Sequence, residues 1–223
     1  MSATANCASC GRLDLAELLD ADRRCAGCVD PRSRRARIEQ LVFNRVGRSG
    51  LPASIRNVPL PDTEGGELAR AWAGGEIPVL VLTGRPGRGK TWLAAAAARE
   101  ALKHRQVRWI AAAQSVHRID GSFGDRDRAD ALAALNGEDS IVLDDLDKAC
   151  DYERQVSRIF TAIDSRIAAG SPLLVTMNCT PAQLGRLVDS RDRHERTRGM
   201  AITSRLNGGV VVELGGPDRR RRA

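Results

Sequence analysis

The stretch "GRPGRGKT", residues 84–91, matches the pattern G-x-x-x-x-G-K-[ST] and decides the fold class. Its glycines let the backbone curl so that N–H groups can point at phosphate oxygens. An apolar run, "VLVLT" at 79–83, precedes it, and an Ala-rich helix is predicted to follow from Lys90 to about Lys103. A buried strand, a glycine-rich turn and a helix N-terminus together form the context in which this pattern binds nucleotides.

Within this loop, Lys90 is expected to reach the β- and γ-phosphates, and the Thr91 hydroxyl is placed to ligate Mg²⁺. The alternative is a glycine-rich turn that matches the pattern by accident, which the flanking strand and helix disfavour. The predicted nucleotide-contacting residues are Gly84, Pro86, Gly87, Arg88, Gly89, Lys90, Thr91 and Trp92.

An acidic pair follows another apolar run further along the chain. "SIVLDD" at 140–145 places Asp144 and Asp145 at the carboxyl end of a predicted strand, the edge beyond which parallel sheets bind ligands. We expect Asp144 to hold Mg²⁺ and Asp145 to orient the attacking water. The alternative is an Asp pair that caps a turn. Asp147 is expected to be a surface turn residue.

Two further polar residues are candidates for the same site. Asn178 ends the run "LLVTMN" at 173–178, where an amide can reach the γ-phosphate and its water; the alternative is a turn Asn that competes with Thr180 to cap the next helix. Arg205 lies near a predicted helix end, from which it could reach a nucleotide held by a neighbouring subunit. The alternative for Arg205 is a salt-bridged surface residue. The predicted catalytic residues are Lys90, Asp144, Asp145, Asn178 and Arg205.

The whole pattern predicts an α/β fold. Further apolar runs at 107–111 and 210–214 bring the predicted strands to five, and helices alternate with them, as in a parallel sheet covered on both faces. Glycines and prolines at 47–66 predict a linker, and residues 32–48 predict an amphipathic helix with an Arg-rich face. The expected divisions are 1–48, a zinc-binding module plus basic helix; 49–216, the ATPase domain; and 217–223, a basic tail.

Four cysteines gather near the N-terminus in two C-x-x-C pairs, Cys7 with Cys10 and Cys25 with Cys28. Four thiolates suit a closed tetrahedral Zn²⁺ site, and a segment this small needs the metal for much of its folding free energy. The alternative is a redox pair, but no βαβ pattern surrounds either one. Cys150 and Cys179 are expected to be ordinary thiols.

The composition restricts the class of protein. The net charge of +7 favours a polyanionic partner; the alternative is a basic surface that serves solubility. All but three of the 35 basic residues are Arg, a bias that codon usage in a GC-rich genome alone could produce. There is no N-terminal apolar segment and no apolar run near the roughly 18 residues that a membrane span needs. We therefore expect a soluble, cytoplasmic protein with no membrane partner, whose cysteines are reduced.

The order of these motifs resembles the DnaC/DnaI-type replicative helicase loaders and their relative IstB, within the AAA+ superfamily. The matching stretches are "GRPGRGKT", "IVLDDLDK", "IFTAIDSRIAAGSPLLVTMN", "TPAQLGRL" and "AITSRL". The resemblance implies that an additional strand, 173–178, lies between the phosphate-loop strand and the acidic strand. The short stretch after Leu214 departs from the wider AAA+ pattern, and from it we expect no C-terminal helical lid. The resemblance also implies that Lys90, Thr91, Asp144, Asp145, Asn178 and Arg205 match Walker A, Walker B, sensor 1 and the arginine finger.

The same resemblance implies an ATPase that delivers or activates a replicative helicase on single-stranded DNA. Its cofactors would be ATP, Mg²⁺ and Zn²⁺, and it would form a homo-oligomer when bound to ATP or DNA. Alternatives are an IstB-like transposition ATPase on duplex DNA, a P-loop kinase or small-molecule NTPase, and a truncated initiator-like regulator. Residues 112–128 could contact single-stranded DNA or form a solvated loop; the residues concerned are His117, Arg118, Phe123, Arg126 and Arg128.

Overall fold

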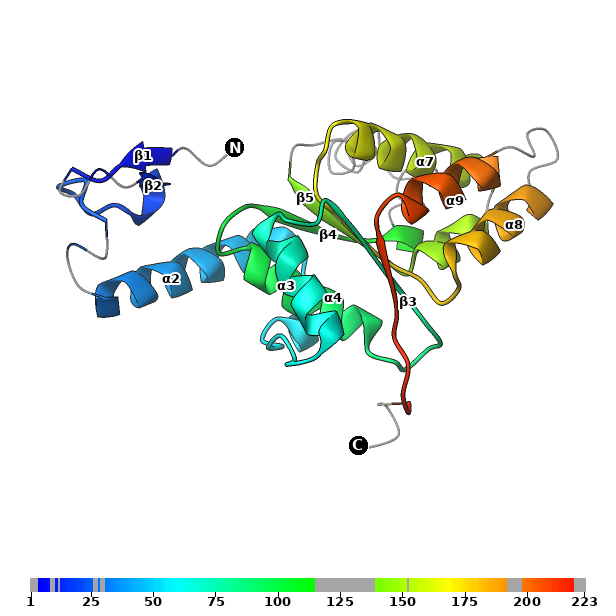
Figure 1. Cartoon of the computed structure of the whole chain (residues 1–223), viewed down its shortest axis with the longest axis horizontal. Helices are drawn as coiled ribbons and strands as arrows, with labels where there is room; N and C mark the ends of the chain where they lie inside the picture. The colour runs from blue at the N-terminus through cyan, green and yellow to red at the C-terminus, as the bar shows by residue number, and fades with distance from the viewer. Residues whose placement is uncertain are drawn as a thin grey trace.

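The computed structural model describes residues 4–8, 11, 13–25, 28, 31–114, 139–151, 153–191 and 198–218. Within this part of the chain, the core is a five-stranded sheet in the order β4-β5-β6-β3-β7, and every neighbouring pair is parallel (Figure 1). The strands are β3 (Val79–Thr83), β4 (Val107–Ala111), β5 (Ser140–Asp144), β6 (Leu173–Thr176) and β7 (Val210–Glu213).

Strand β6 lies between β3, which leads into the phosphate loop, and β5, which ends in the acidic pair. Val175 of β6 is in register with Val81 on one side and Leu143 on the other. This order confirms the additional-strand class. Because the strands are parallel, their carboxyl ends meet at one edge of the sheet, where polar residues from all three can come together.

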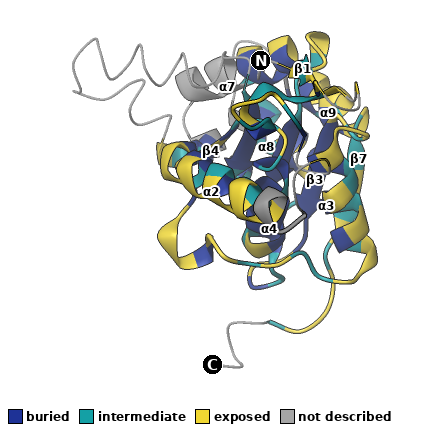
Figure 2. Ribbon diagram, turned by 90° about the vertical axis from the view of Figure 1, so that its left-hand side faces the viewer, coloured by how far each residue is buried: buried dark blue, intermediate teal, exposed yellow. Residues whose placement is uncertain are grey.

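Helices cover both faces of the sheet, as predicted. The central strands β3, β5 and β6 are buried along almost their whole length, whereas the edge strand β7 is partly exposed (Figure 2). Alternate residues of each strand enter opposite cores, so Leu143 packs with Ile163 and Ile202 while Val142 packs with Trp72 and Leu102. One face carries α3 (Glu64–Gly74) and α4 (Lys90–Ala101), and the other carries α7 (Glu153–Ala168), α8 (Pro181–Arg191) and α9 (Arg198–Asn207).

Helix α3 was not predicted, because Gly65 and Gly66 suggested a linker. The Thr63 hydroxyl accepts a hydrogen bond from the Gly66 N–H at 3.2 Å and caps this helix. A Cβ atom at Gly66 would lie 1.9 Å from the Pro61 carbonyl oxygen. The glycine therefore allows close packing in the first helical turn and does not break the chain. The predicted linker 47–66 contains a further short 3₁₀ helix, η2 (Ala53–Ile55).

The N-terminal part forms a hairpin of β1 (Thr4–Asn6) and β2 (Leu13–Leu15), then η1 (Ala16–Leu18) and the long helix α2 (Pro31–Ser49), which packs against β4 (Figure 1). The prediction of a helix over 32–48 is confirmed.

The basic side chains of α2 do not all face solvent, because one of its arginines lies in the interior. Arg45 is only 2% exposed. It donates to the Leu102 carbonyl oxygen at 2.8 Å and to the Glu17 carboxylate at 3.4 Å. Arg45 therefore joins the N-terminal segment to the end of α4.

Arg105 fastens the C-terminal end of α3 to the sheet. Its guanidinium donates to the carbonyl oxygens of Trp72 at 2.6 Å and Ala73 at 2.7 Å, and to the Ser140 hydroxyl at 2.6 Å. It also lies over the Trp72 ring, 5.1 Å from the centroid. The planar fork of guanidinium donors is needed to satisfy these partners together.

We expect Arg105→Lys to lower the free energy of unfolding by about 1–3 kcal/mol, because one ammonium cannot replace the fork and buried carbonyls lose donors. Chemical denaturation measures the change. Arg70→Lys, at an exposed position of α3, is the matched control and should leave stability within about 0.5 kcal/mol of wild type. Equal stabilities of the two variants would contradict the assignment.

Candidate nucleotide-binding site

Four of the predicted site residues meet at the carboxyl edge of the sheet. Lys90 and Thr91 begin α4, Asp144 ends β5, and Asn178 follows β6. Direct hydrogen bonds join Lys90 to Asn178, at 2.9 Å, and Thr91 to Asp144, at 3.1 Å. Residues separated by 53 and 88 positions in the chain are thus brought into one polar cluster because their strands are parallel.

Lys90 is almost completely buried, with 5% of its surface exposed. Its ammonium donates to the carbonyl oxygens of Gly84 at 2.7 Å and Arg85 at 3.0 Å, in addition to the Asn178 side-chain oxygen. These three acceptors match the three protons of the ammonium. Phosphate oxygens bound in this loop would compete with them for the lysine.

Glycines give the phosphate loop its shape. Gly84 has φ of +130° and Gly87 has φ of +80°, both in the region that side chains disfavour. A Cβ atom would lie 2.6 Å from the Leu214 carbonyl oxygen at Gly84 and 2.0 Å from a carboxylate oxygen of Asp218 at Gly87. The segment after β7 therefore packs directly on the loop. Its backbone leaves no room for a side chain at Gly84, while at Gly87 the Asp218 carboxylate would have to move away.

Asp144 accepts hydrogen bonds from two hydroxyl groups, that of Thr91 at 3.1 Å and that of Thr176 at 2.7 Å. Burial raises the pKa of Asp144 above its ordinary value, and the neighbouring Asp145 charge raises it further. Sequence reasoning missed Thr176; a hydroxyl at the end of the otherwise apolar run of β6 was the available signal.

Asp145 has an unusual backbone, with φ of +56° at a residue other than glycine. Its N–H donates to the Thr176 hydroxyl at 2.9 Å, and its carboxylate forms a 2.5 Å ion pair with Lys148. The two aspartates therefore point to different partners. Strained backbone of this kind is concentrated at functional sites.

The expectation for Asp147 was wrong, since it is not a simple surface turn residue. It lies in η3 (Leu146–Asp151) and accepts hydrogen bonds from the backbone and side-chain N–H groups of Asn178. Thr180 and Gln183 exchange hydrogen bonds in a capping box at the start of α8. The cap of α8 is therefore Thr180, which leaves the Asn178 side chain for the polar cluster.

A cavity of about 220 Å³ adjoins the phosphate loop. Its wall combines loop and α4 residues with the segment before α3 and the segment after β7, so it is suited to a nucleobase beside the loop. Sequence reasoning identified Trp92, which is 56% exposed, but missed residues 58–63 and 214–215, which it had assigned to a linker and a strand end. The lining residues are Val58, Pro59, Pro61, Thr63, Arg88, Gly89, Trp92, Leu93, Leu214 and Gly215.

Arg205 does not join this cluster within the chain. It lies in the last turn of α9, is exposed, and forms an ion pair with Asp164 of α7. Both side chains of the pair are about half exposed, so the Arg205 guanidinium is accessible from outside the molecule.

The N-terminal cysteines form a second candidate centre. The sulfur atoms of Cys7 and Cys28 lie 3.9 Å apart and those of Cys25 and Cys28 lie 3.5 Å apart, while the Cys25 N–H donates to the Cys7 sulfur at 3.0 Å. Four sulfurs at about 2.3 Å from a tetrahedral Zn²⁺ lie about 3.8 Å from one another. The spacing is thus compatible with zinc and too long for a disulfide. Cys10 lies outside the described residues.

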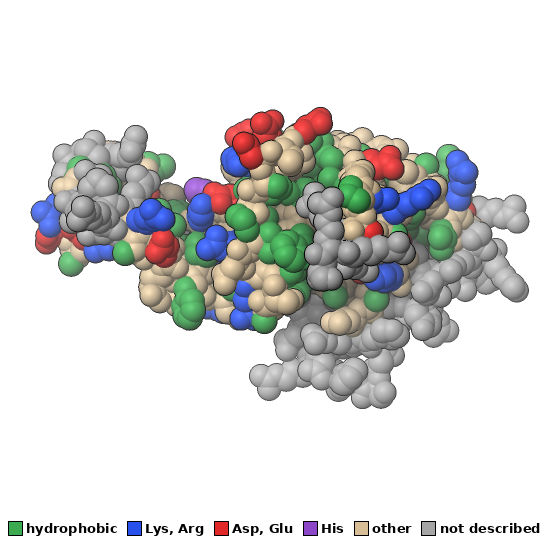
Figure 3. All heavy atoms as spheres, turned by 90° about the horizontal axis from the view of Figure 1, so that it is seen from below, with side chains coloured by type: hydrophobic (Ala, Val, Ile, Leu, Met, Phe, Trp, Pro, Cys, Tyr) green, Lys and Arg blue, Asp and Glu red, His purple; other side chains and the backbone are tan. Residues whose placement is uncertain are grey.

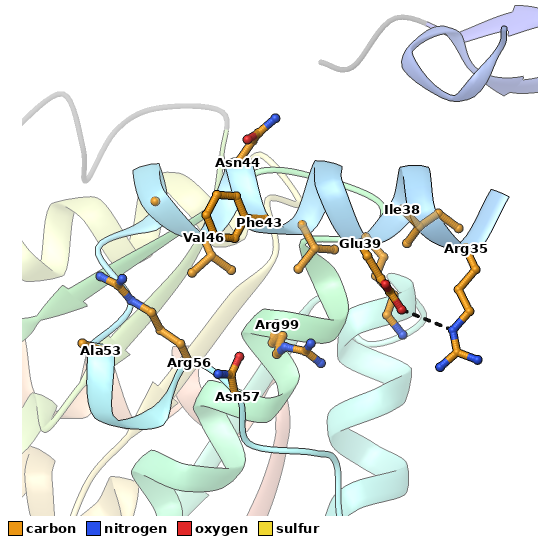
Figure 4. A pocket seen from close by; sticks show the side chains of 13 residues that line it. Arg35, Ile38, Glu39, Phe43, Asn44, Val46, Ala53, Arg56, Asn57 and Arg99 are labelled. Carbon is orange, nitrogen blue, oxygen red and sulfur yellow. Dashed lines mark hydrogen bonds and ion pairs between the residues drawn. The ribbon is translucent and has the colours of Figure 1, made fainter. Parts of the chain in front are cut away.

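A larger cavity, about 1070 Å³, lies between α2, residues 53–57 and the end of α4 (Figure 4). Its wall holds apolar side chains of α2, including Phe43, which is 74% exposed, together with basic side chains such as Arg56 and Arg99. It includes no residue of the phosphate loop or the acidic pair. The chemistry of the polar cluster, and not cavity size, identifies the candidate nucleotide site.

Basic residues on the face drawn in Figure 3 are scattered among acidic ones, and the described residues of that face form no continuous basic stripe. The candidate DNA-contacting side chains His117, Arg118, Phe123, Arg126 and Arg128 lie outside the described residues, as do the basic residues 219–222. Burial raises the pKa of the Cys179 thiol to about 11, which fits an unreactive thiol. Among the described residues, none of the helices combines the length and the apolar composition of a membrane span.

The family model described as IstB-like ATP binding protein matches residues 75–194, more than half of the chain. A search of curated proteins finds no match.

Solved structures with a similar fold include DnaI (TM-score 0.60, 21% identity, 76% of this chain and 94% of that one). The DnaC helicase loader gives a TM-score of 0.56 at 18% identity, over 74% of this chain and 100% of that one. DnaA bound to AMPPCP and single-stranded DNA gives 0.59 at 18% identity, over 77% of this chain and 53% of that one.

We expect Asp144→Asn to raise the melting temperature, because it removes a buried charge while keeping an acceptor for the hydroxyls. Since the folded-state pKa is raised, ionised Asp144 costs stability once the pH exceeds the ordinary carboxyl range. The gain over wild type should therefore be larger at pH 8 than at pH 4.5, as thermal melts can measure. Asp62→Asn, at an exposed position, should show no such gain; a variant less stable than wild type at both pH values would contradict the buried-charge argument.

Proposed function

The chain belongs to the IstB-like ATP-binding protein family, and we propose that this AAA+ ATPase loads or activates a replicative DNA helicase on single-stranded DNA. The observation that carries the proposal is the extent of the structural match. The fold aligns over 94% of the DnaI chain and 100% of the DnaC helicase loader chain, but over only about half of DnaA. We propose that it acts in the cytoplasm, where its DNA substrate would be found.

The residues of the polar cluster fit ATP with Mg²⁺. Lys90 would bind the β- and γ-phosphates, while the Thr91 hydroxyl and the Asp144 carboxylate, already 3.1 Å apart, would hold the metal. The metal supplies charge neutralisation at the phosphates when bound. The Asp145 carboxylate would orient the attacking water once it leaves Lys148, and the Asn178 amide would donate to the γ-phosphate or the water.

Arg205 supports an active form with more than one subunit. Its guanidinium is exposed and paired only with a half-exposed carboxylate among the interactions seen, so a neighbouring subunit's γ-phosphate could replace Asp164 as its partner. An arginine supplied in this way would stabilise the transition-state charge and make hydrolysis depend on assembly.

The N-terminal part, 1–48, is proposed as a zinc module and basic helix that dock on the helicase. Cys7, Cys10, Cys25 and Cys28 would form a closed Zn²⁺ site with a structural role, since four protein ligands leave no open position. The family match begins at residue 75, so this part lies outside the matched ATP-binding domain.

A second candidate function is that of a transposition ATPase acting on duplex DNA, which the IstB name of the family favours. It predicts a preference for duplex over single-stranded DNA and the formation of protein filaments on the duplex. A P-loop kinase is less well supported, because the strand between β3 and β5 and the Asn178 amide fit the AAA+ arrangement.

The deciding experiment is a pull-down from cells with and without ATP, followed by identification of the partners. We expect a hexameric replicative helicase to be captured by the full chain and lost when residues 1–48 are deleted. The Lys90→Ala variant should lose ATP turnover but retain the zinc module, so it separates binding of the partner from ATP turnover. Capture of a transposase in place of a helicase, with preference for duplex DNA, would favour the second candidate.

Mixing variants tests the role of Arg205. Arg205→Ala and Lys90→Ala chains should each hydrolyse ATP at a small fraction of the wild-type rate, with losses on the order of 10³ for a missing finger. A mixture should regain activity, because Lys90→Ala subunits still supply Arg205 to intact sites. Arg70→Ala is the control. A mixture no more active than its parts would count against a shared site.

Metal analysis tests the cysteine module. The purified chain should contain about one zinc per molecule, and Cys25→Ser should lose most of it because three thiolates bind zinc less tightly than four. Cys179→Ser, a matched change far from the cluster, should keep the full zinc content. A wild-type chain that is folded and free of zinc would refute the assignment.

A further inference from the structure

We propose that Asp147 is a positioning residue that fixes which way the side-chain amide of Asn178 faces. The inference rests on the proposed role of Asn178 in ATP hydrolysis. It begins from a chain of contacts in which Asp147 holds Asn178 and Asn178 in turn contacts Lys90.

An asparagine amide has two ends of nearly the same shape and opposite chemistry. The nitrogen end donates hydrogen bonds and the oxygen end accepts them. A site that needs a donor is therefore spoiled if the amide turns by 180°, because lone pairs would then face the phosphate oxygens. To prevent this, each end of the amide needs a neighbour whose hydrogen-bonding character is fixed, as a donor only or as an acceptor only.

The two neighbours of Asn178 supply that fixed character. The Asp147 carboxylate can only accept, and the Asn178 nitrogen lies 2.9 Å from it. The Lys90 ammonium can only donate, and the Asn178 oxygen lies 2.9 Å from it. A turned amide would bring oxygen to carboxylate and nitrogen to ammonium, and both contacts would repel.

Asp147 is itself well placed to act as an anchor. Its second oxygen accepts a hydrogen bond from the backbone N–H of Asn178 at 3.1 Å, so the carboxylate binds both the backbone and the side chain of this residue. The preceding residue, Leu146, is 1% exposed and roots η3 in the core. Burial is the main cause of the raised pKa of the Cys179 thiol, and the nearby Asp147 charge raises this pKa further.

This arrangement leaves one amide proton for chemistry. The Asn178 nitrogen carries two protons, and one of them is donated in the hydrogen bond to the Asp147 carboxylate. The other can be donated to a phosphate oxygen or to the attacking water. Asp147 thus joins the end of β5 to the end of β6 and would act on the reaction through Asn178, without touching the nucleotide.

The test compares Asp147→Asn and Asp147→Glu. An Asn at this position can donate or accept, so it no longer selects one orientation of the amide. We expect kcat for ATP hydrolysis to fall about tenfold, less than the roughly 10²–10³ for losing a catalytic donor outright. The Kd for a fluorescent ATP analogue should stay within about twofold. Asp147→Glu keeps an acceptor-only carboxylate and should retain more activity than Asp147→Asn.

A double-mutant cycle distinguishes positioning from a merely structural role. In an Asn178→Ala background, Asp147→Asn should cause no further loss of kcat, because there is no amide left to orient. Asp139→Asn is the matched control: this carboxylate lies at the opposite end of β5 and accepts from Arg108 at 2.9 Å. It should leave kcat unchanged.

Two results would overturn the proposal. One is a wild-type kcat in Asp147→Asn; the other is an equal loss of kcat with and without Asn178. Failure of the proposed function is a different outcome, in which wild type does not hydrolyse ATP or Lys90→Ala hydrolyses it as fast as wild type. Thermal melts of each variant show that the folded protein is being compared.

Discussion

The position of β6 between β3 and β5 is the constraint on which the site depends. Residues of all three strands are buried on both faces, so the sheet can carry polar chemistry only at its ends. Because the strands are parallel, these ends share one edge, and a lysine, a threonine, two aspartates and an asparagine meet there. Each donor finds its acceptor on a different element, which makes the edge a single hydrogen-bonded unit.

Much of the fold could be predicted because the strands are short and apolar, and the central ones are buried. The runs at 79–83 and 107–111 coincide with β3 and β4, and the other three strands end only one or two residues early. The pattern of a buried strand does not reveal its neighbours, however. The order of the strands came from the resemblance to AAA+ proteins, carried by the motifs at the strand ends.

What the sequence did not reveal depends on partners far along the chain. Arg45 looked like one more surface arginine, yet its carbonyl partner is 57 residues away; Asp147 looked like a turn residue, yet its partner is 31 residues away. The helix α3 was missed for a related reason. Gly66 resembles a chain breaker until the Pro61 carbonyl oxygen packed against it is seen.

The buried contact of Arg45 has a mechanical consequence for the N-terminal part of the chain, residues 1–48. Arg45 holds the carbonyl of Leu102, one residue beyond the last turn of α4, and the first turn of the same helix carries Lys90 and Thr91. Twelve helical residues span about 18 Å without a hinge. A displacement of residues 1–48 would therefore be transmitted along this helix to its first turn, which carries the two residues proposed to bind the triphosphate and Mg²⁺.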